Sequence, residues 1–362
     1  MSPITRRRGL AALFAIVAAL HLLPIWRVQY LPTVDGPSHL YNAVVLRELA
    51  AGTPEFTRAF FVDLRPHPNW LTHLLLAAAL GVAPLVVAEK LVVSMIVLLF
   101  LGGCWRLAGV IEPERRVYAF LVMPLAYHLL FQMGFYNYSL AVALVPFVLA
   151  SWWERPGWRT ALWLLLCYAA HVLPAAVAVV CVVIIGASRK QWRALIAVVP
   201  VTALLAWFFL QPKPPGGTWI WSGTLLWKPL LQTFLLLTFD PRQLTLGTAL
   251  AIVLGTLIVL TFFREKMFRE RDVFLLLALA TTAMYLIAPI SAEEGLLLKA
   301  RLLIFPYLVI LPWLTSRLGR LLLPLAVVFA IVATANVFFL RDAWKRNDKV
   351  MARAILPLRD AA

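Results

Sequence analysis

The sequence predicts an all-α integral membrane protein with about eleven transmembrane helices. Of its 362 residues, 62% are hydrophobic and only 14% are charged, and the mean hydropathy is +0.86. Soluble domains carry roughly a quarter charged residues, so this composition excludes an ordinary soluble chain. The apolar residues also fall into separate runs, divided by short breaks that hold most of the Lys and Arg.

Eleven apolar runs are candidates for the spanning helices. The first follows Arg6–Arg8, lacks a small-residue cleavage site and is succeeded by further runs, so we interpret it as an uncleaved span with a cytoplasmic N-terminus. The net charge of +16 then reflects basic breaks that face the cytoplasm, without any need for nucleic acid binding. The expected spans lie near residues 9–26, 88–108, 117–132, 138–153, 160–171, 174–187, 194–210, 243–263, 273–290, 302–316 and 321–340.

Residues 27–90 are expected to form one long outer loop within a single transmembrane domain, residues 1–340. Ser38–Ala51 has the pattern of an amphipathic interfacial helix. Trp70–Val87 is apolar enough to be considered as a span, but Pro84 and Gly81 interrupt it, and we favour a second interfacial helix. Residues 341–362 are expected to form a short basic tail on the outer face.

The loop segment Asp35-Gly-Pro-Ser-His39 is the strongest candidate for chemistry. A helix that starts at Pro37 would bring the side chains of Asp35 and His39 close to each other. A carboxylate there can accept a proton from a hydroxyl group or hold a metal ion. The alternative is that Asp35 only caps the helix, since Asp is common at helix starts.

Five further residues are candidate substrate-binding groups. Tyr136 and Asn137 lie in a tight turn between two spans, where they either line a site or belong to an ordinary interfacial belt. His171 interrupts the short helices at 160–187, either as a packed histidine or as part of a cavity. Lys299 and Arg301 precede a span, where they either contact a phosphate or extend toward the interface.

With these residues identified, the chain resembles the membrane-embedded glycosyltransferases of the C superfamily, such as the protein mannosyltransferases and the aminoarabinose transferase. The resemblance rests on Asp35-Gly-Pro-Ser-His39 after the first span, the interfacial helices and the short hairpin near 160–187. It implies that Asp35 is the catalytic carboxylate, acting on the acceptor or through a divalent metal ion. Many members have a second acid in the second outer loop, where this chain has Tyr136-Asn-Tyr138.

The sequence therefore suggests a glycosyltransferase at the outer face of a bacterial inner membrane. It would move a sugar from a polyprenyl-phosphate carrier to a glycan, lipid or protein acceptor, with Asp35 and His39 as catalytic residues and Lys299 and Arg301 at the phosphate. The alternative is a polytopic lipid or solute transporter or a non-catalytic membrane protein. Transporters place polar residues and broken helices near the bilayer midplane, whereas these candidates gather at one face.

Overall fold

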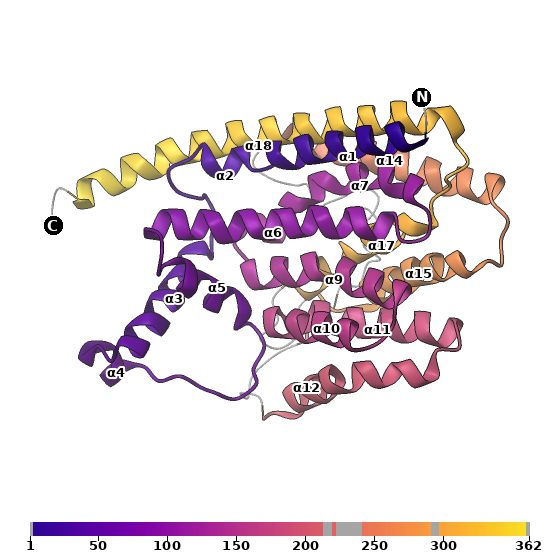
Figure 1. Ribbon diagram of the computed structural model, residues 1–362. Coiled ribbons are helices and arrows are strands. Elements are labelled where there is room, and N and C mark those ends of the chain that lie inside the picture. Colours follow the sequence, from indigo (N-terminus) through magenta and orange to yellow (C-terminus); the bar gives the residue numbers. More distant parts are fainter. Residues whose placement is uncertain (1–2, 213–218, 222–240, 291–296, 360–362) are drawn as a thin grey trace.

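The computed structural model shows a bundle of helices that lie roughly side by side (Figure 1). It describes residues 3–212, 219–221, 241–290 and 297–359. The protein is all-helical, with 79% of residues in helices and no strand in the described part. The all-α class that the sequence predicts is thereby confirmed.

Among the described residues, five helices are long and apolar enough to cross a bilayer, which is typical of a membrane protein. Much of their surface faces outward: inside Trp192–Leu210, only 17% of the apolar window is buried. Exposed Leu, Ile, Val and Phe side chains of this density are stable in lipid rather than in water. The five are Arg7–Trp26 (α1, Pro3–Leu20, and α2, Leu23–Trp26), α6 (Leu85–Ala108), Trp192–Leu210 (η3, Trp192–Val198, and α12, Val199–Leu210), α14 (Pro241–Arg264) and Gly319–Lys349 in η7 (Gly319–Leu321) and α18 (Leu322–Arg359).

The predicted count of about eleven spans is not confirmed, because most of the other apolar runs form helices shorter than 18 residues or divide into short pieces. Pro124 lies where the run from 117 to 132 divides, and Pro306 and Pro312 lie in short helical turns of the run from 302 to 316. These elements are η1 (Pro113–Arg116), α7 (Val117–Val122), η2 (Met123–Tyr127), α8 (Leu129–Gln132), η5 (Glu270–Asp272), α15 (Val273–Ile287), α16 (Leu298–Leu302), α17 (Phe305–Val309) and η6 (Leu311–Trp313).

The centre of the bundle is α9 (Tyr136–Glu154), which is buried along most of its length. It packs against α6, α10 (Trp158–Ala170) and α11 (Val172–Ser188). The last two form the expected short hairpin, broken at His171.

Residues 27–90 carry α3 (Gly36–Ala51), α4 (Pro54–Ala59) and α5 (Leu71–Ala79) at one end of the bundle (Figure 1). The helix expected at 38–51 is present, and the apolar segment from Trp70 forms only a nine-residue helix that is too short to span. Its residues Thr72 and Leu76 are fully buried, because α5 packs against α3, α6, α9 and α10. This segment therefore covers the end of the bundle.

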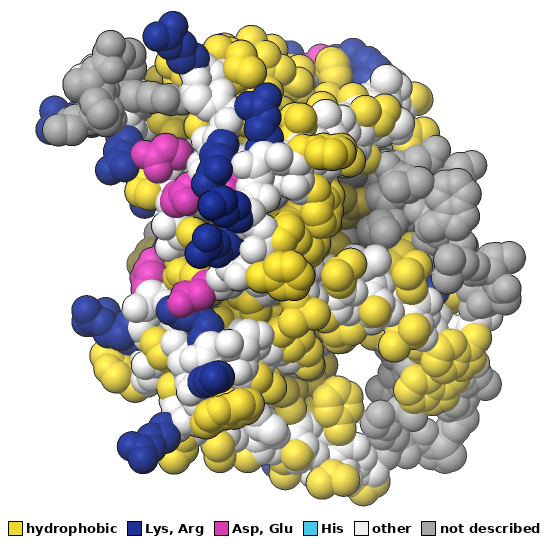
Figure 2. Space-filling model, turned by 90° about the vertical axis from the view of Figure 1, so that its right-hand side faces the viewer, with side chains coloured by type: hydrophobic (Ala, Val, Ile, Leu, Met, Phe, Trp, Pro, Cys, Tyr) yellow, Lys and Arg dark blue, Asp and Glu magenta, His cyan; other side chains and the backbone are white. Residues whose placement is uncertain are grey.

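The opposite end of the bundle, here called the arginine-rich end, collects the basic breaks. Figure 2 looks onto this side of the molecule, where Lys and Arg gather in a band with interspersed Asp and Glu, beside a largely apolar area. Ion pairs connect one break to the next: Arg7 with Glu114, Arg106 with Glu154, Arg189 with Glu270, and Arg317 with Glu265.

The segment expected as a separate tail continues the last helix. α18 runs without a break from Leu322 to Arg359 and ends at the same end of the bundle as α3 and α4 rather than at the arginine-rich end (Figure 1). Asp348 on this helix accepts the backbone N–H groups of Gln29 (2.9 Å) and Tyr30 (3.1 Å), which ties it to the start of the first loop.

Candidate functional site

A cavity of about 460 Å³ lies beneath the first loop, at what is here called the cavity end. It collects side chains from α3, α5, the start of α9, the break between α10 and α11, and α16. Five of the predicted site residues, from distant parts of the sequence, meet here: Asp35, His39, Asn137, His171 and Arg301. The remaining lining residues are Ser38, Asn42, Asn69, His73, Phe135 and Tyr138.

Asp35 is held at the cavity by its backbone. Its N–H donates to the carbonyl of Met133 at 2.9 Å, in the turn that precedes α9. Gly134 in that turn has φ +86°, and a Cβ built there would lie 2.6 Å from the nitrogen of Gly36. A side chain at Gly134 would therefore push the first loop away from the bundle.

The carboxylate of Asp35 does not cap α3. Asp35 occupies the N-cap position and Pro37 lies in the first turn, as expected, but the Asp35 side chain makes no capping hydrogen bond. It is half-buried and lines the cavity instead. The alternative that Asp35 serves only as a cap is therefore not supported by the geometry.

His39 and His73 form a pair at the wall of the cavity. Nδ1 of His39 lies 2.8 Å from Nε2 of His73, so one imidazole donates to the other. The His39 ring also stacks on Tyr136, with 5.4 Å between ring centroids. Burial, and then the neighbouring His73, lower the pKa of His39 to about 4, and burial also lowers the pKa of His73.

Arg301 faces His171 from across the cavity. Nη1 of Arg301 lies 3.2 Å from Nε2 of His171, while Nδ1 of His171 accepts the N–H of Leu173 at 3.1 Å. Since Nδ1 accepts, the proton of the neutral ring belongs on Nε2. Two donors then face each other, an arrangement that an acceptor oxygen placed near both would satisfy.

The Arg301 side chain is otherwise supported by aromatic rings. Its guanidinium lies 5.1 Å from the ring centroid of Phe135 and 6.0 Å from that of Tyr138. The Tyr138 hydroxyl donates to the Arg301 carbonyl at 2.5 Å. Among the described residues no carboxylate lies within ion-pair distance of Arg301, although it attracts Asp35 electrostatically.

Two predicted substrate-binding residues lie outside this cavity. Tyr136 is fully buried behind it, where its hydroxyl donates to Glu89 at 2.7 Å and lies 2.9 Å from Thr33 Oγ1. Lys299 is buried too, and its ammonium donates to the carbonyl of Leu286 at 3.1 Å. Neither side chain lines the cavity.

From the sequence, His73 is expected to be a solvated loop residue, and Glu89 is not recognised as a buried acid. The signal for Glu89 was present, because an acid at the start of an apolar run is costly in a membrane unless it has a partner. That partner is Tyr136, which explains why a tyrosine occupies this turn. By contrast, Asp63 and His67 pair with each other and with Arg65 on the exposed loop, as solvated residues do.

The donor set at the cavity does not fit a divalent metal ion. Asp35 is the one carboxylate among the lining residues, and His39 and His73 each use a ring nitrogen on the other. Within the described residues no three His, Cys, Asp or Glu side chains gather as ligands. The residues that line the cavity therefore offer no set of ligands for the metal ion that the resemblance implies at Asp35.

No protein-family model, curated protein or solved structure matches this chain.

Proposed function

We propose that this protein is a glycosyltransferase that moves a sugar from a polyprenyl-phosphate carrier to an acceptor at the outer face of a bacterial inner membrane. The observation that supports this most is one cavity lined by a carboxylate and a guanidinium that form no ion pair, Asp35 and Arg301. A site with a base on one side and a fixed cation on the other suits the displacement of a phosphate by a hydroxyl group.

In the proposed reaction, Asp35 accepts the proton of the acceptor hydroxyl as its oxygen bonds to the anomeric carbon of the sugar. The bond between that carbon and the carrier phosphate breaks, and the electron pair leaves with the phosphate. Arg301 and the Nε2–H of His171 stabilise the negative charge that develops on the leaving oxygen. His39 positions the segment around Asp35 through its contacts with His73 and Tyr136.

The surroundings of the cavity suit a donor with a long apolar chain. Val34, directly before Asp35, exposes 72% of its surface, and Tyr41 on α3 exposes 54%. A prenyl chain that lies against such side chains removes apolar area from water while its phosphate enters the cavity. The arginine-rich end would then face the cytoplasm, as the positive-inside rule requires.

The test is the substitution Asp35→Asn, which removes the base but keeps the shape of the side chain. Purified protein in proteoliposomes is given undecaprenyl phosphate carrying mannose, glucose or aminoarabinose, with bacterial envelope extract as the acceptor. Release of free undecaprenyl phosphate is measured by mass spectrometry. We expect D35N to lower the rate by about a hundredfold or more, because a positioned general base contributes at least that factor.

Asp63→Asn is the matched control, because Asp63 is an acid of the same loop that is paired with Arg65 outside the cavity. It should retain the wild-type rate. Equal rates for D35N and wild type would contradict the proposed role of Asp35. Transfer of intact donor across the bilayer without release of undecaprenyl phosphate would instead identify a transporter, the alternative function.

A further inference from the structure

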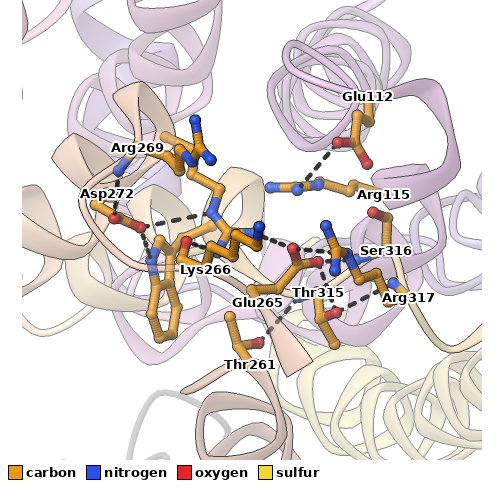
Figure 3. A network of polar contacts seen from close by, with 12 residues as sticks. Glu112, Arg115, Thr261, Glu265, Lys266, Arg269, Asp272, Thr315, Ser316 and Arg317 are labelled. Carbon is orange, nitrogen blue, oxygen red and sulfur yellow. Dashed lines mark hydrogen bonds and ion pairs between the residues drawn. The ribbon is translucent and has the colours of Figure 1, made fainter. Parts of the chain in front are cut away.

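The arginine-rich end contains a network of charges that the proposed reaction does not use (Figure 3). Its centre is Glu265, which follows α14 and has a side chain only 6% exposed. Glu265 pairs with Arg271 at 2.8 Å and with Arg317 at 3.2 Å, and accepts the Thr315 hydroxyl at 2.8 Å. One carboxylate thus serves two guanidinium groups.

A third arginine of this network is almost fully buried. The Arg115 side chain is 1% exposed, donates to the carbonyl of Pro312 and lies 3.4 Å from Glu112. The Nε atom of Arg115 is buried without a hydrogen-bond partner, and that of Arg271 makes no hydrogen bond but lies 3.5 Å from a carboxylate oxygen of Asp272. Buried cations with unsatisfied donors are costly unless further acceptors approach them.

These side chains surround a second cavity, of about 330 Å³, at the arginine-rich end. Five of the lining residues are cationic and three are acidic, and Glu265 is already shared. The balance leaves an excess of positive charge that a phosphate group would neutralise. The cations are Arg115, Lys266, Arg269, Arg271 and Arg317, and the acids are Glu112, Glu265 and Glu270.

Two exposed aromatic residues lie within two positions of lining residues in the sequence. Phe268, between Lys266 and Arg269, is 100% exposed and is held at φ +62°, a conformation that bulky residues rarely adopt. Phe263, at the end of α14, is 85% exposed. Exposed aromatic rings next to a basic cavity are typical of a surface that meets lipid headgroups and the adjoining acyl chains.

We infer that the cavity lined by Arg115, Arg271 and Arg269 binds the phosphate of an anionic phospholipid headgroup. The guanidinium groups donate hydrogen bonds to the phosphate oxygens. Phe268 and Phe263 contact the acyl chains of the same lipid. This site lies at the opposite end from the cavity proposed for sugar transfer, so the two are tested independently.

The experiment uses the full-length protein in detergent, titrated with phosphatidylglycerol and observed by native mass spectrometry. The variant K266Q/R269Q removes two exposed cations of the cavity and leaves the buried network in place. The matched control, R155Q/R159Q, removes two exposed arginines that do not line it. We expect K266Q/R269Q to weaken phosphatidylglycerol binding by about tenfold, and the control by less than about twofold.

Three outcomes would overturn the inference. Equal weakening in both variants would mean that binding is a diffuse effect of charge. Equal binding of phosphatidylcholine and phosphatidylglycerol by the wild type would mean that anionic headgroups are not recognised. Displacement of the lipid by inorganic phosphate at equal concentration would assign the cavity to a soluble anion.

Discussion

The two ends of the helix bundle arrange their charges differently. At the arginine-rich end, opposite charges lie in contact, as in Arg106 with Glu154 at 2.6 Å and Arg271 with Glu265 at 2.8 Å. At the cavity end, Asp35 and Arg301 line the same cavity, yet no contact within ion-pair distance joins them. Within the described residues, the first arrangement connects helices and the second leaves groups open to a ligand.

This difference separates stability from function. A buried ion pair, once formed, is costly to break because the remaining partner stays buried and unpaired. A charged group that faces a cavity can be neutralised at little cost to the fold, since water already solvates it. Removal of a negative charge at the arginine-rich end should therefore lower stability, whereas removal of one at the cavity end should lower activity.

The largest effect on stability is expected from Glu265→Gln. It removes the closer carboxylate of Arg271, whose side chain is 7% exposed, and leaves only Asp272 at 3.5 Å. We expect the free energy of unfolding to fall by about 3 kcal/mol. Denaturant unfolding in detergent micelles measures this value. Asp35→Asn should leave the free energy of unfolding nearly unchanged.

The control for this prediction is Glu154→Gln, which breaks the pair with Arg106 at the same end. Both side chains are more than a third exposed, at 45% and 36%, so the loss should stay below about 1 kcal/mol. If D35N lowers the free energy of unfolding as much as E265Q does, the proposed separation of stability and function between the two ends is wrong.

Much of the fold was predictable from the sequence because apolar runs and basic breaks are local signals. The first span and the runs near 88–108, 194–210, 243–263 and 321–340 correspond to the five long apolar helices. Proline alone does not reveal which helices will break: Pro146 lies inside the continuous α9, whereas Pro124 lies where its run divides. That outcome depends on packing against neighbouring helices.

The site was predictable in part for a similar reason. Asp35 stood out because polar loop residues beside a membrane are few, and His171 because it interrupts an apolar hairpin. The adjacent Tyr136 and Asn137 were predicted together, but neighbours on a helix point about 100° apart, so only Asn137 reaches the cavity. The approach of Arg301 to His171 joins residues 130 positions apart, which one sequence cannot reveal.

A smaller effect is expected from Gly134→Ala, which tests how the cavity end is held together. The new Cβ would lie 2.6 Å from the nitrogen of Gly36 and 2.8 Å from that of Asp35. We expect the free energy of unfolding to fall by about 2 kcal/mol, with a loss of sugar transfer. Denaturant unfolding in detergent micelles measures the first effect, and release of undecaprenyl phosphate measures the second.

Gly52→Ala is the matched control for this position. Gly52 has φ +75° and nothing within 4 Å of the added Cβ, so only the backbone strain of about 1 kcal/mol applies. If G134A and G52A have equal effects on stability and transfer, contact between the first loop and the turn before α9 does not position Asp35.

The smallest effect is expected from pH, through His39 and His73. The unfolded chain takes up a proton on His39 near pH 6.5, whereas the folded protein takes it up only near pH 4. Because the unfolded state binds more protons in this interval, the free energy of unfolding should decrease as the pH falls from 6.5 to 4, and this contribution should then level off. Burial of His73 adds to the decrease in the same direction. The variant H39Q/H73Q should show a flatter dependence than wild type in unfolding measured across this range, and an identical slope would mean that the two imidazoles are solvated rather than enclosed at the cavity wall.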